Sequence, residues 1–250
     1  MSDGYSQAPT HGLPGRVGIH GPGDPHDMES SAHAHHPKLQ HHFDDMAQQA
    51  EASTLGMWVF LVTEIMFFGG LFMAYLLYRW QSPEGFAEAS NHLNVIWGGI
   101  NTAVLIISSL TMALAVRAAQ TSAPARTQVR WLVVTMTFGL AFLGIKAIEY
   151  ADKFEHHLVP GPHFQWPGTY SDAAEQFYSL YFAMTGLHAV HMIIGVGIML
   201  VITFMAWRRT FDEHYYTPVE VAGLYWHFVD IVWIFLFPLL YLIGYHYGAH

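Results

Sequence analysis

The stretch FYSLYFAMTGLHAVHMIIGVGIMLVITFMAW, residues 177–207, contains no Asp, Glu, Lys or Arg. About 20 helical residues, each rising ~1.5 Å, cross the ~30 Å hydrocarbon core of a bilayer. Four further apolar runs of sufficient length occupy residues 55–79, 97–116, 131–151 and 224–247. Only helices and closed barrels satisfy their backbone groups in hydrocarbon, and runs of this length favour helices. The sequence therefore predicts an all-α fold, an integral membrane five-helix bundle.

Composition supports the same class of protein. Hydrophobic residues make up 52% of the 250-residue chain and charged residues only 12%, whereas a soluble domain is usually ~25% charged. The net charge of −9 argues against a nucleic-acid partner, which would require a basic patch. Because the chain has no cysteine, disulfides and thiolate-ligated metal sites are excluded.

The chain divides into two unlike parts. Residues 1–54 are rich in Gly, Pro, Ser, Asp and His without an apolar period, so we expect a largely disordered polar tail. Residues 43–53 at its end can form a short amphipathic lead-in helix. The tail holds eight histidines, which either bind metal weakly or simply remain solvated. Residues 55–250 form the transmembrane domain.

The loops between the apolar runs alternate in charge. The loop after the second run carries Arg117, Arg126 and Arg130, and the loop after the fourth run carries Arg208 and Arg209. Arginine-rich loops favour the cytoplasmic side of a membrane. Because the number of spans is odd, we expect the N-terminus to be cytoplasmic and the C-terminus outside.

Ionisable residues inside the spans cost ~2.5–3.5 kcal/mol each, so each requires an explanation. Glu64 lies ~15 Å into the first span. It is either a protonated acid that bonds a neighbouring helix or lipid head group, or a member of a proton relay. Lys146 and Glu149 are three residues apart and can pair on one helix face. We expect these two residues to form a structural ion pair or a lipid head-group site rather than to take part in catalysis.

Two pairs of residues with the same spacing contain histidine. His188 and His191 lie near the middle of the fourth span. Two histidines on one face can ligate metal or haem, but a transmembrane haem needs facing histidines on two helices, so interhelical hydrogen bonding is the simpler interpretation. His227 and Asp230 lie one turn apart in the fifth span. There the carboxylate would hold the tautomer of the imidazole.

Small residues in the runs predict closely packed helices. The glycines concerned are Gly69, Gly70, Gly98, Gly99, Gly195 and Gly197. Asn101 with Thr102, and Ser108 with Ser109, can hydrogen-bond between helices. A small transporter would require broken helices or a polar cavity, and no run indicates either.

Several motifs resemble one known family. Residues 225–237, YWHFVDIVWIFLF, resemble the closing signature of subunit III of haem–copper cytochrome c oxidases. Residues 185–191, TGLHAVH, are similar to its Thr-Gly-x-His-x-x-His segment, and residues 63–70 resemble its acidic first motif. The segment that starts at Asn101, and Glu149 with its neighbour Tyr150, also fit. Longer family members have seven helices, so this chain is similar to the short bacterial type with five.

The resemblance implies an accessory, non-catalytic subunit of a terminal oxidase in the bacterial cytoplasmic membrane. Haem and copper would reside in subunits I and II, and this chain would hold no cofactor. It would pack directly against subunit I, bind phospholipid, and support oxygen access and proton uptake. The residues that match polar positions of the family are Glu64, Glu149, His188, His191, His227 and Asp230. Alternatives are a subunit of a quinol oxidase or nitric oxide reductase, and a self-standing haem b membrane cytochrome.

Overall fold

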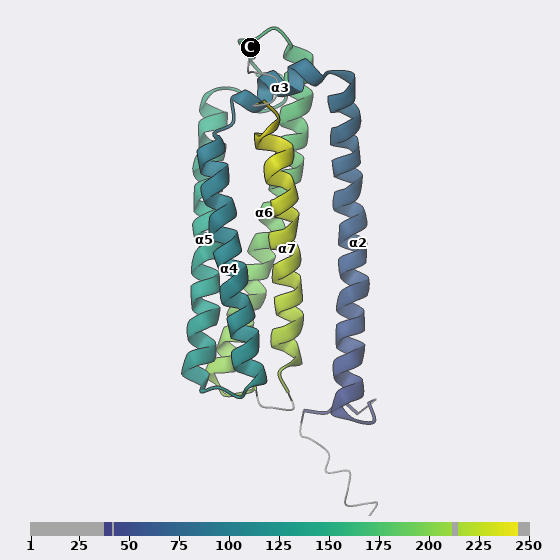
Figure 1. Ribbon diagram of the computed structural model, residues 1–250, viewed down its shortest axis with the longest axis vertical. Coiled ribbons are helices and arrows are strands. Elements are labelled where there is room, and N and C mark those ends of the chain that lie inside the picture. The colour runs from purple at the N-terminus through teal and green to yellow at the C-terminus, as the bar shows by residue number, and fades with distance from the viewer. Residues whose placement is uncertain (1–37, 42, 212–214, 245–250) are drawn as a thin grey trace, which may run out of the picture. The chain divides into compact units, whose positions relative to one another are not determined.

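The computed structural model describes residues 38–41, 43–211 and 215–244. Most of the predicted His-rich tail and the end of the fifth predicted run lie outside these residues. The described helices are α2 (Met46–Gln81), α3 (Pro83–Asn91), α4 (Val95–Gln120), α5 (Ala125–Glu155), α6 (Ser171–Trp207) and α7 (Thr217–Tyr241) (Figure 1). All except α3 are long and apolar enough to cross a membrane. The predicted all-α architecture with five spans is confirmed.

Two features at the ends of the spans differ from the prediction. Helix α2 begins at Met46 rather than at residue 55, since the Asp45 carboxylate caps it by accepting a 2.7 Å hydrogen bond from the Gln48 N–H. The predicted lead-in helix is therefore the start of α2. The short helix α3 was not predicted, because it is too polar and brief for an apolar run. It is anchored by Ser90, whose hydroxyl donates to the Leu240 carbonyl at 2.7 Å.

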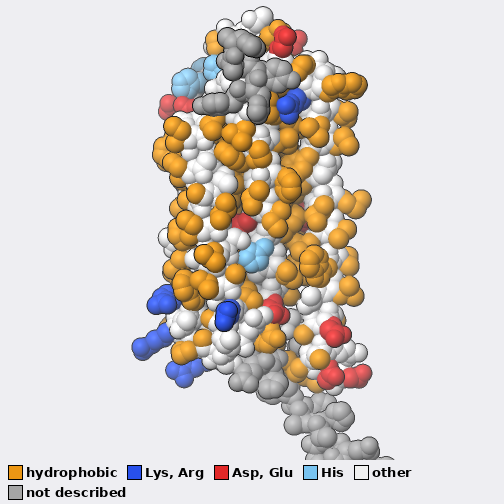
Figure 2. All heavy atoms as spheres, in the orientation of Figure 1, with side chains coloured by type: hydrophobic (Ala, Val, Ile, Leu, Met, Phe, Trp, Pro, Cys, Tyr) orange, Lys and Arg blue, Asp and Glu red, His pale blue; other side chains and the backbone are white. Residues whose placement is uncertain are grey.

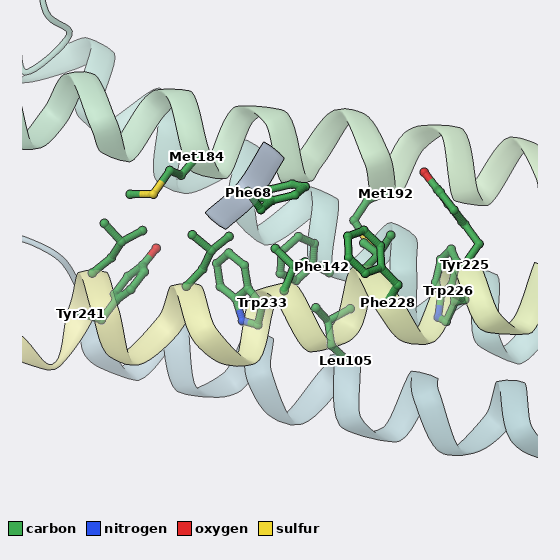
Figure 3. Packing of buried hydrophobic residues seen from close by; sticks show 14 of the residues in the cluster. Phe68, Leu105, Phe142, Met184, Met192, Tyr225, Trp226, Phe228, Trp233 and Tyr241 are labelled. Carbon is green, nitrogen blue, oxygen red and sulfur yellow. The ribbon is translucent and has the colours of Figure 1, made fainter. Parts of the chain in front are cut away.

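Helix α7 is the most enclosed of the five spans and contacts α2, α3, α4 and α6. Its large aromatic side chains project into the core that it shares with its neighbours (Figure 3). Trp226 donates its indole N–H to Ser108 Oγ at 3.0 Å, and Trp233 donates to Thr102 Oγ1 at 3.1 Å. Both tryptophans thus satisfy their one polar atom on α4 while they bury their rings.

Helix α2 differs from α7 in how little of it this chain covers. In their most apolar stretches, 17% of α2 is buried against 56% of α7. Figure 1 shows α2 at one side of the group formed by α4, α5, α6 and α7. Most of the surface of α2 is therefore available to lipid or to another protein.

The glycine prediction holds at only two of its six positions. A Cβ on Gly98 would lie 2.7 Å from the Phe237 ring, and one on Gly195 would lie 3.0 Å from the Trp226 ring. The other four glycines have no atom within 4 Å of such a Cβ: Gly69, Gly70, Gly99 and Gly197. The prediction missed Gly139, where a Cβ would come within 2.7 Å of the buried Trp226 ring. The α7 aromatics therefore account for the need for Gly98, Gly139 and Gly195.

Gly139→Ala should lower the stability of the bundle by about 1–3 kcal/mol, because the added methyl would displace the Trp226 ring in a packed core. Gly144→Ala is a matched control on the same helix, since no atom lies within 4 Å of its new Cβ. It should be neutral or stabilising by up to ~1 kcal/mol. Thermal unfolding in detergent, followed by circular dichroism, measures both. Equal melting temperatures for the two variants would contradict the packing described here.

Candidate functional site

A closed polar network surrounds Lys146 in the C-terminal part of α5. The Lys146 ammonium donates to Glu149 Oε2 at 3.1 Å, and to the hydroxyls of Tyr181 on α6 and Tyr241 on α7 at 3.0 Å each. These tyrosines in turn donate to Glu149 Oε1, at 2.8 and 2.5 Å respectively. An ammonium has three donors, and all three are used. The network therefore ties α5 to α6 and α7.

The network is sealed from its surroundings. The side chains of Lys146 and Glu149 are only 4% and 6% exposed. The ammonium also lies 4.9–5.7 Å from the ring centroids of Tyr150, Tyr181, Trp233 and Tyr241, distances at which aromatic faces attract a cation. Such an enclosed and fully bonded ion pair suits a structural role.

A second pair joins α2 to α6. His191 Nε2 lies 3.2 Å from Glu64 Oε2, and the two side chains are 12% and 19% exposed. The ring of His191 packs on Phe68, with centroids 5.3 Å apart. The hydroxyl of Tyr225 on α7 donates to the His191 carbonyl at 3.0 Å. Three helices therefore fix this histidine, and Glu64 bonds a neighbouring helix rather than standing alone.

The hydrogen bonds of His191 determine where the proton in its contact with Glu64 can reside. Nδ1 lies 2.9 Å from the Leu187 carbonyl, which can only accept, so Nδ1 carries a proton. One further proton then lies between Nε2 and Glu64. It resides either on the carboxyl, with the imidazole neutral, or on the imidazole, with the carboxylate ionised. The pair has no net charge in either form and can pass this proton between two helices.

The structure separates His188 from His191, although their spacing suggested one shared face. His188 is 1% exposed and packs against Phe142 and Trp233, with ring centroids 5.3 Å away in both cases. Neither ring nitrogen has a hydrogen-bond partner within the described chain. The described residues contain no group of three or more His, Asp or Glu that could hold a metal ion. The two histidines therefore have different surroundings, and interhelical bonding is seen for His191 only.

His227 and Asp230 also behave differently from the expectation. His227 Nδ1 forms a 2.7 Å hydrogen bond with Ser109 Oγ on α4, so a hydroxyl holds the imidazole and Asp230 does not. The Asp230 carboxyl is 2% exposed, and neither of its oxygens has a partner among the described residues. Asn101 is fully buried and its amide is likewise unpaired. The predicted interhelical bonds thus form at Thr102, Ser108 and Ser109, but not at Asn101.

Sequence reasoning missed the tyrosines of the Lys146 network. Tyr181 and Tyr241 lie 35 and 95 residues from Lys146 in the chain, and spacing cannot relate positions on different helices. A signal was nevertheless available. A phenol inside a span needs a hydrogen-bond partner, and the few charged groups in the spans are the natural candidates.

Lys146→Met should destabilise the bundle by about 3–5 kcal/mol, because it leaves Glu149 buried without its counter-charge. The double variant Lys146→Met with Glu149→Gln should recover most of that loss, since neither charge remains. Unfolding in detergent for the two single variants and the double variant gives the coupling energy directly. A double variant no more stable than Lys146→Met would show that the pair is not what holds this end of the bundle.

Comparison with known proteins relates this geometry to one family. A family model for cytochrome c oxidase subunit III matches residues 38–245. Cytochrome c oxidase subunit 3 of Synechocystis sp. is 33% identical over 219 residues, which cover 86% of this chain and 80% of that protein. The subunit of the same name from Thermostichus vulcanus is 33% identical, over 80% of this chain and 92% of that protein. Cytochrome bo(3) ubiquinol oxidase subunit 3 of Pseudomonas aeruginosa is 29% identical, over 81% and 91%. This chain belongs to the cytochrome c oxidase subunit III family.

Proposed function

We propose that this chain is the accessory, non-redox subunit III of a haem–copper terminal oxygen reductase in the bacterial cytoplasmic membrane. It packs against subunit I, and subunits I and II supply haem and copper. Family membership supports the complex. The observation that carries the accessory role is that two partly buried histidines bond neighbouring helices, since His191 bonds Glu64 and His227 bonds Ser109.

A second candidate concerns the electron donor. Relatives of similar identity are named cytochrome c oxidase subunit 3 and ubiquinol oxidase subunit 3, so a quinol oxidase is the alternative complex. The donor binds elsewhere in either complex. Oxidation of reduced cytochrome c or of a quinol by the purified complex discriminates between the two.

The charge distribution supports a cytoplasmic N-terminus. Arg117 ends α4, Arg126 and Arg130 begin α5, and Arg208 and Arg209 follow α6. These elements meet at the end of the bundle where α2 begins, and Figure 2 shows Lys and Arg side chains gathered at that end. Positively charged ends of spans favour the cytoplasm.

A groove between α2 and α7 supports phospholipid binding. It encloses about 460 Å³ and is lined almost entirely by apolar side chains, among them Ile65 and Phe72 of α2 and Ile231 and Phe235 of α7. Toward the arginine-rich end it adjoins a hollow lined by Arg117. An acyl chain fits the apolar part, and a guanidinium suits a phosphate head group.

The Glu64–His191 pair supports a role in proton uptake. It lies near the middle of its two helices, is partly exposed, and holds one proton that either partner can carry. In this role the pair buffers protons beside subunit I, whereas oxygen is reduced in subunit I itself.

Purification in mild detergent tests the proposed assembly. The tagged chain should retain a haem–copper subunit I in equal amount, detected by its haem spectrum. The same experiment tests the haem b alternative, which requires a Soret band in the isolated chain. If the chain never co-migrates with a haem-bearing subunit, the proposed function is wrong.

Glu64→Gln should leave assembly intact and keep oxygen consumption within about twofold of the unmodified complex, because the glutamine N–H can still donate to His191 and the redox centre lies elsewhere. Thr63→Val is the control, since the Thr63 hydroxyl bonds only the Phe60 carbonyl of its own helix. Oxygen uptake and subunit content of the purified complexes are the measurements. Normal assembly with complete loss of electron transfer would contradict the accessory role.

A further inference from the structure

A small hollow lies between the start of α4 and the end of α5, away from the arginine-rich end of the bundle. It encloses about 200 Å³, several times the space that one water molecule needs. Asn94 and Trp97 line one side, and α5 residues between Ile145 and Lys153 line the other. Figure 1 shows α4 and α5 side by side. This α4–α5 hollow is therefore distinct from the groove between α2 and α7.

Lys153 is the buried cation of the hollow. Its side chain is only 8% exposed, and lysine is almost never buried unless it is paired. Its ammonium donates to the His92 carbonyl at 3.1 Å and to Asp152 Oδ2 at 2.9 Å. An ammonium has three donors, so one is left without an acceptor among the described residues. Unlike Lys146, Lys153 can therefore still donate to a ligand in the hollow.

The charges that line the hollow are already balanced. Glu149 pairs with Lys146 at 3.1 Å, and Asp152 pairs with Lys153 at 2.9 Å. A ligand with a net charge would disturb this balance, whereas a ligand with one charge of each sign would preserve it. Lys153 offers a donor to the negative group, and the half-exposed Asp152 carboxylate offers an acceptor to the positive group. The lining therefore favours a zwitterion.

The level of the hollow in the membrane identifies the source of such a zwitterion. Lys153 lies two residues before the end of α5, and Asn94 directly precedes α4, so both lie where the spans leave the hydrocarbon core. Phospholipid head groups occupy this level. Trp97 and Ile148 are 44% and 66% exposed at the hollow, and tryptophan is typical of this interface. The hollow is smaller than the ~300 Å³ at which pockets for drug-sized ligands begin, so it takes a head group, while acyl chains continue over these apolar side chains.

We propose that the α4–α5 hollow binds the head group of a zwitterionic phospholipid that carries a primary amine. The phosphate accepts a hydrogen bond from the Lys153 ammonium. The Asn94 amide N–H is a second donor, since its oxygen already caps α4. The amine donates to Asp152, which a quaternary ammonium cannot do because it has no N–H. This site goes beyond the lipid groove between α2 and α7, and it requires neither that groove nor the oxidase complex.

Native mass spectrometry of the 250-residue chain, purified in detergent and stripped of lipid, tests the site. Phosphatidylethanolamine is added, and the fraction of chain that carries a lipid is measured. We expect Lys153→Met to weaken the tightest binding by about tenfold, the effect of one hydrogen bond to a charged group. Lys153→Arg keeps a cationic donor and should bind within about threefold of the unmodified chain. Equal binding by Lys153→Met and the unmodified chain would overturn the proposal.

A second variant leaves Lys153 and its hydrogen bonds in place. Ile145 is half-buried in the lining, so Ile145→Trp should fill the hollow and weaken phosphatidylethanolamine binding to a similar extent. Ile198→Trp on α6 is the control, since Ile198 is 37% exposed and lies outside this hollow. Circular dichroism verifies that each variant is folded. Unchanged binding by folded Ile145→Trp would overturn the proposal even if Lys153→Met fails to fold.

Asp152→Asn tests the partner of the amine. The unmodified chain should bind phosphatidylethanolamine about twofold to fivefold more tightly than phosphatidylcholine or phosphatidylglycerol, the range for a half-exposed ion pair. Asp152→Asn should shift this preference toward phosphatidylglycerol, because the lining then carries a net positive charge. A purely structural Asp152 would alter stability but not the preference.

The remaining outcomes separate this site from other sources of phosphate and from the proposed function. Equal affinity of the unmodified chain for all three lipids would overturn the proposal, and so would displacement of phosphatidylethanolamine by inorganic phosphate alone. Because these measurements use the chain by itself, they do not depend on co-purification with a haem-bearing subunit, which tests the proposed function. Lys153→Met also leaves the groove between α2 and α7 intact, so lipid binding there is scored separately.

Discussion

Hydrocarbon offers no hydrogen-bond partner, so polar groups inside the bundle depend on partners within the protein. Lys146 shows how completely this can be met, with three donors on three acceptors from three helices. The tryptophans of α7 obey the same constraint through Ser108 and Thr102. Apolar packing against lipid distinguishes poorly between arrangements of helices, since lipid is as apolar as leucine. These polar contacts therefore fix which faces meet.

The five spans were predictable from sequence because length and apolarity are local properties of a run. The Lys146–Glu149 pair was predictable for a similar reason, since both residues are on one helix and three apart. Glu64 and His191 are 127 residues apart, and no spacing rule links them. Their contact depends on how α2 and α6 are rotated, which the whole bundle decides. The same limit explains Gly139, whose importance comes from Trp226 on another helix.

The two ion-pair candidates differ in a way that spacing alone did not reveal. Lys146 and Glu149 are nearly sealed, and each donor of the ammonium is committed. Glu64 and His191 are several times more exposed, and a hydrogen bond between them requires one shared proton. A group that exchanges protons with its surroundings needs access, whereas a sealed ion pair is costly to break, because loss of one partner leaves a buried charge. Exposure therefore favours a structural role for the first pair and a proton-holding role for the second.

Some buried polar side chains, among them His188 and Asp230, have no hydrogen-bond partner among the described residues. His188 is enclosed by rings of its own chain, so no neighbouring subunit can reach it. Asp230 is enclosed to a similar degree, because the residue is 2% exposed and neither carboxyl oxygen is accessible from outside the chain. Leaving such a group unpaired in hydrocarbon costs several kcal/mol, and the chain does not supply a partner among its described residues. The bundle therefore satisfies Lys146 fully, whereas the cost of enclosing Asp230 must be offset by the packing and hydrogen bonds of the helices around it.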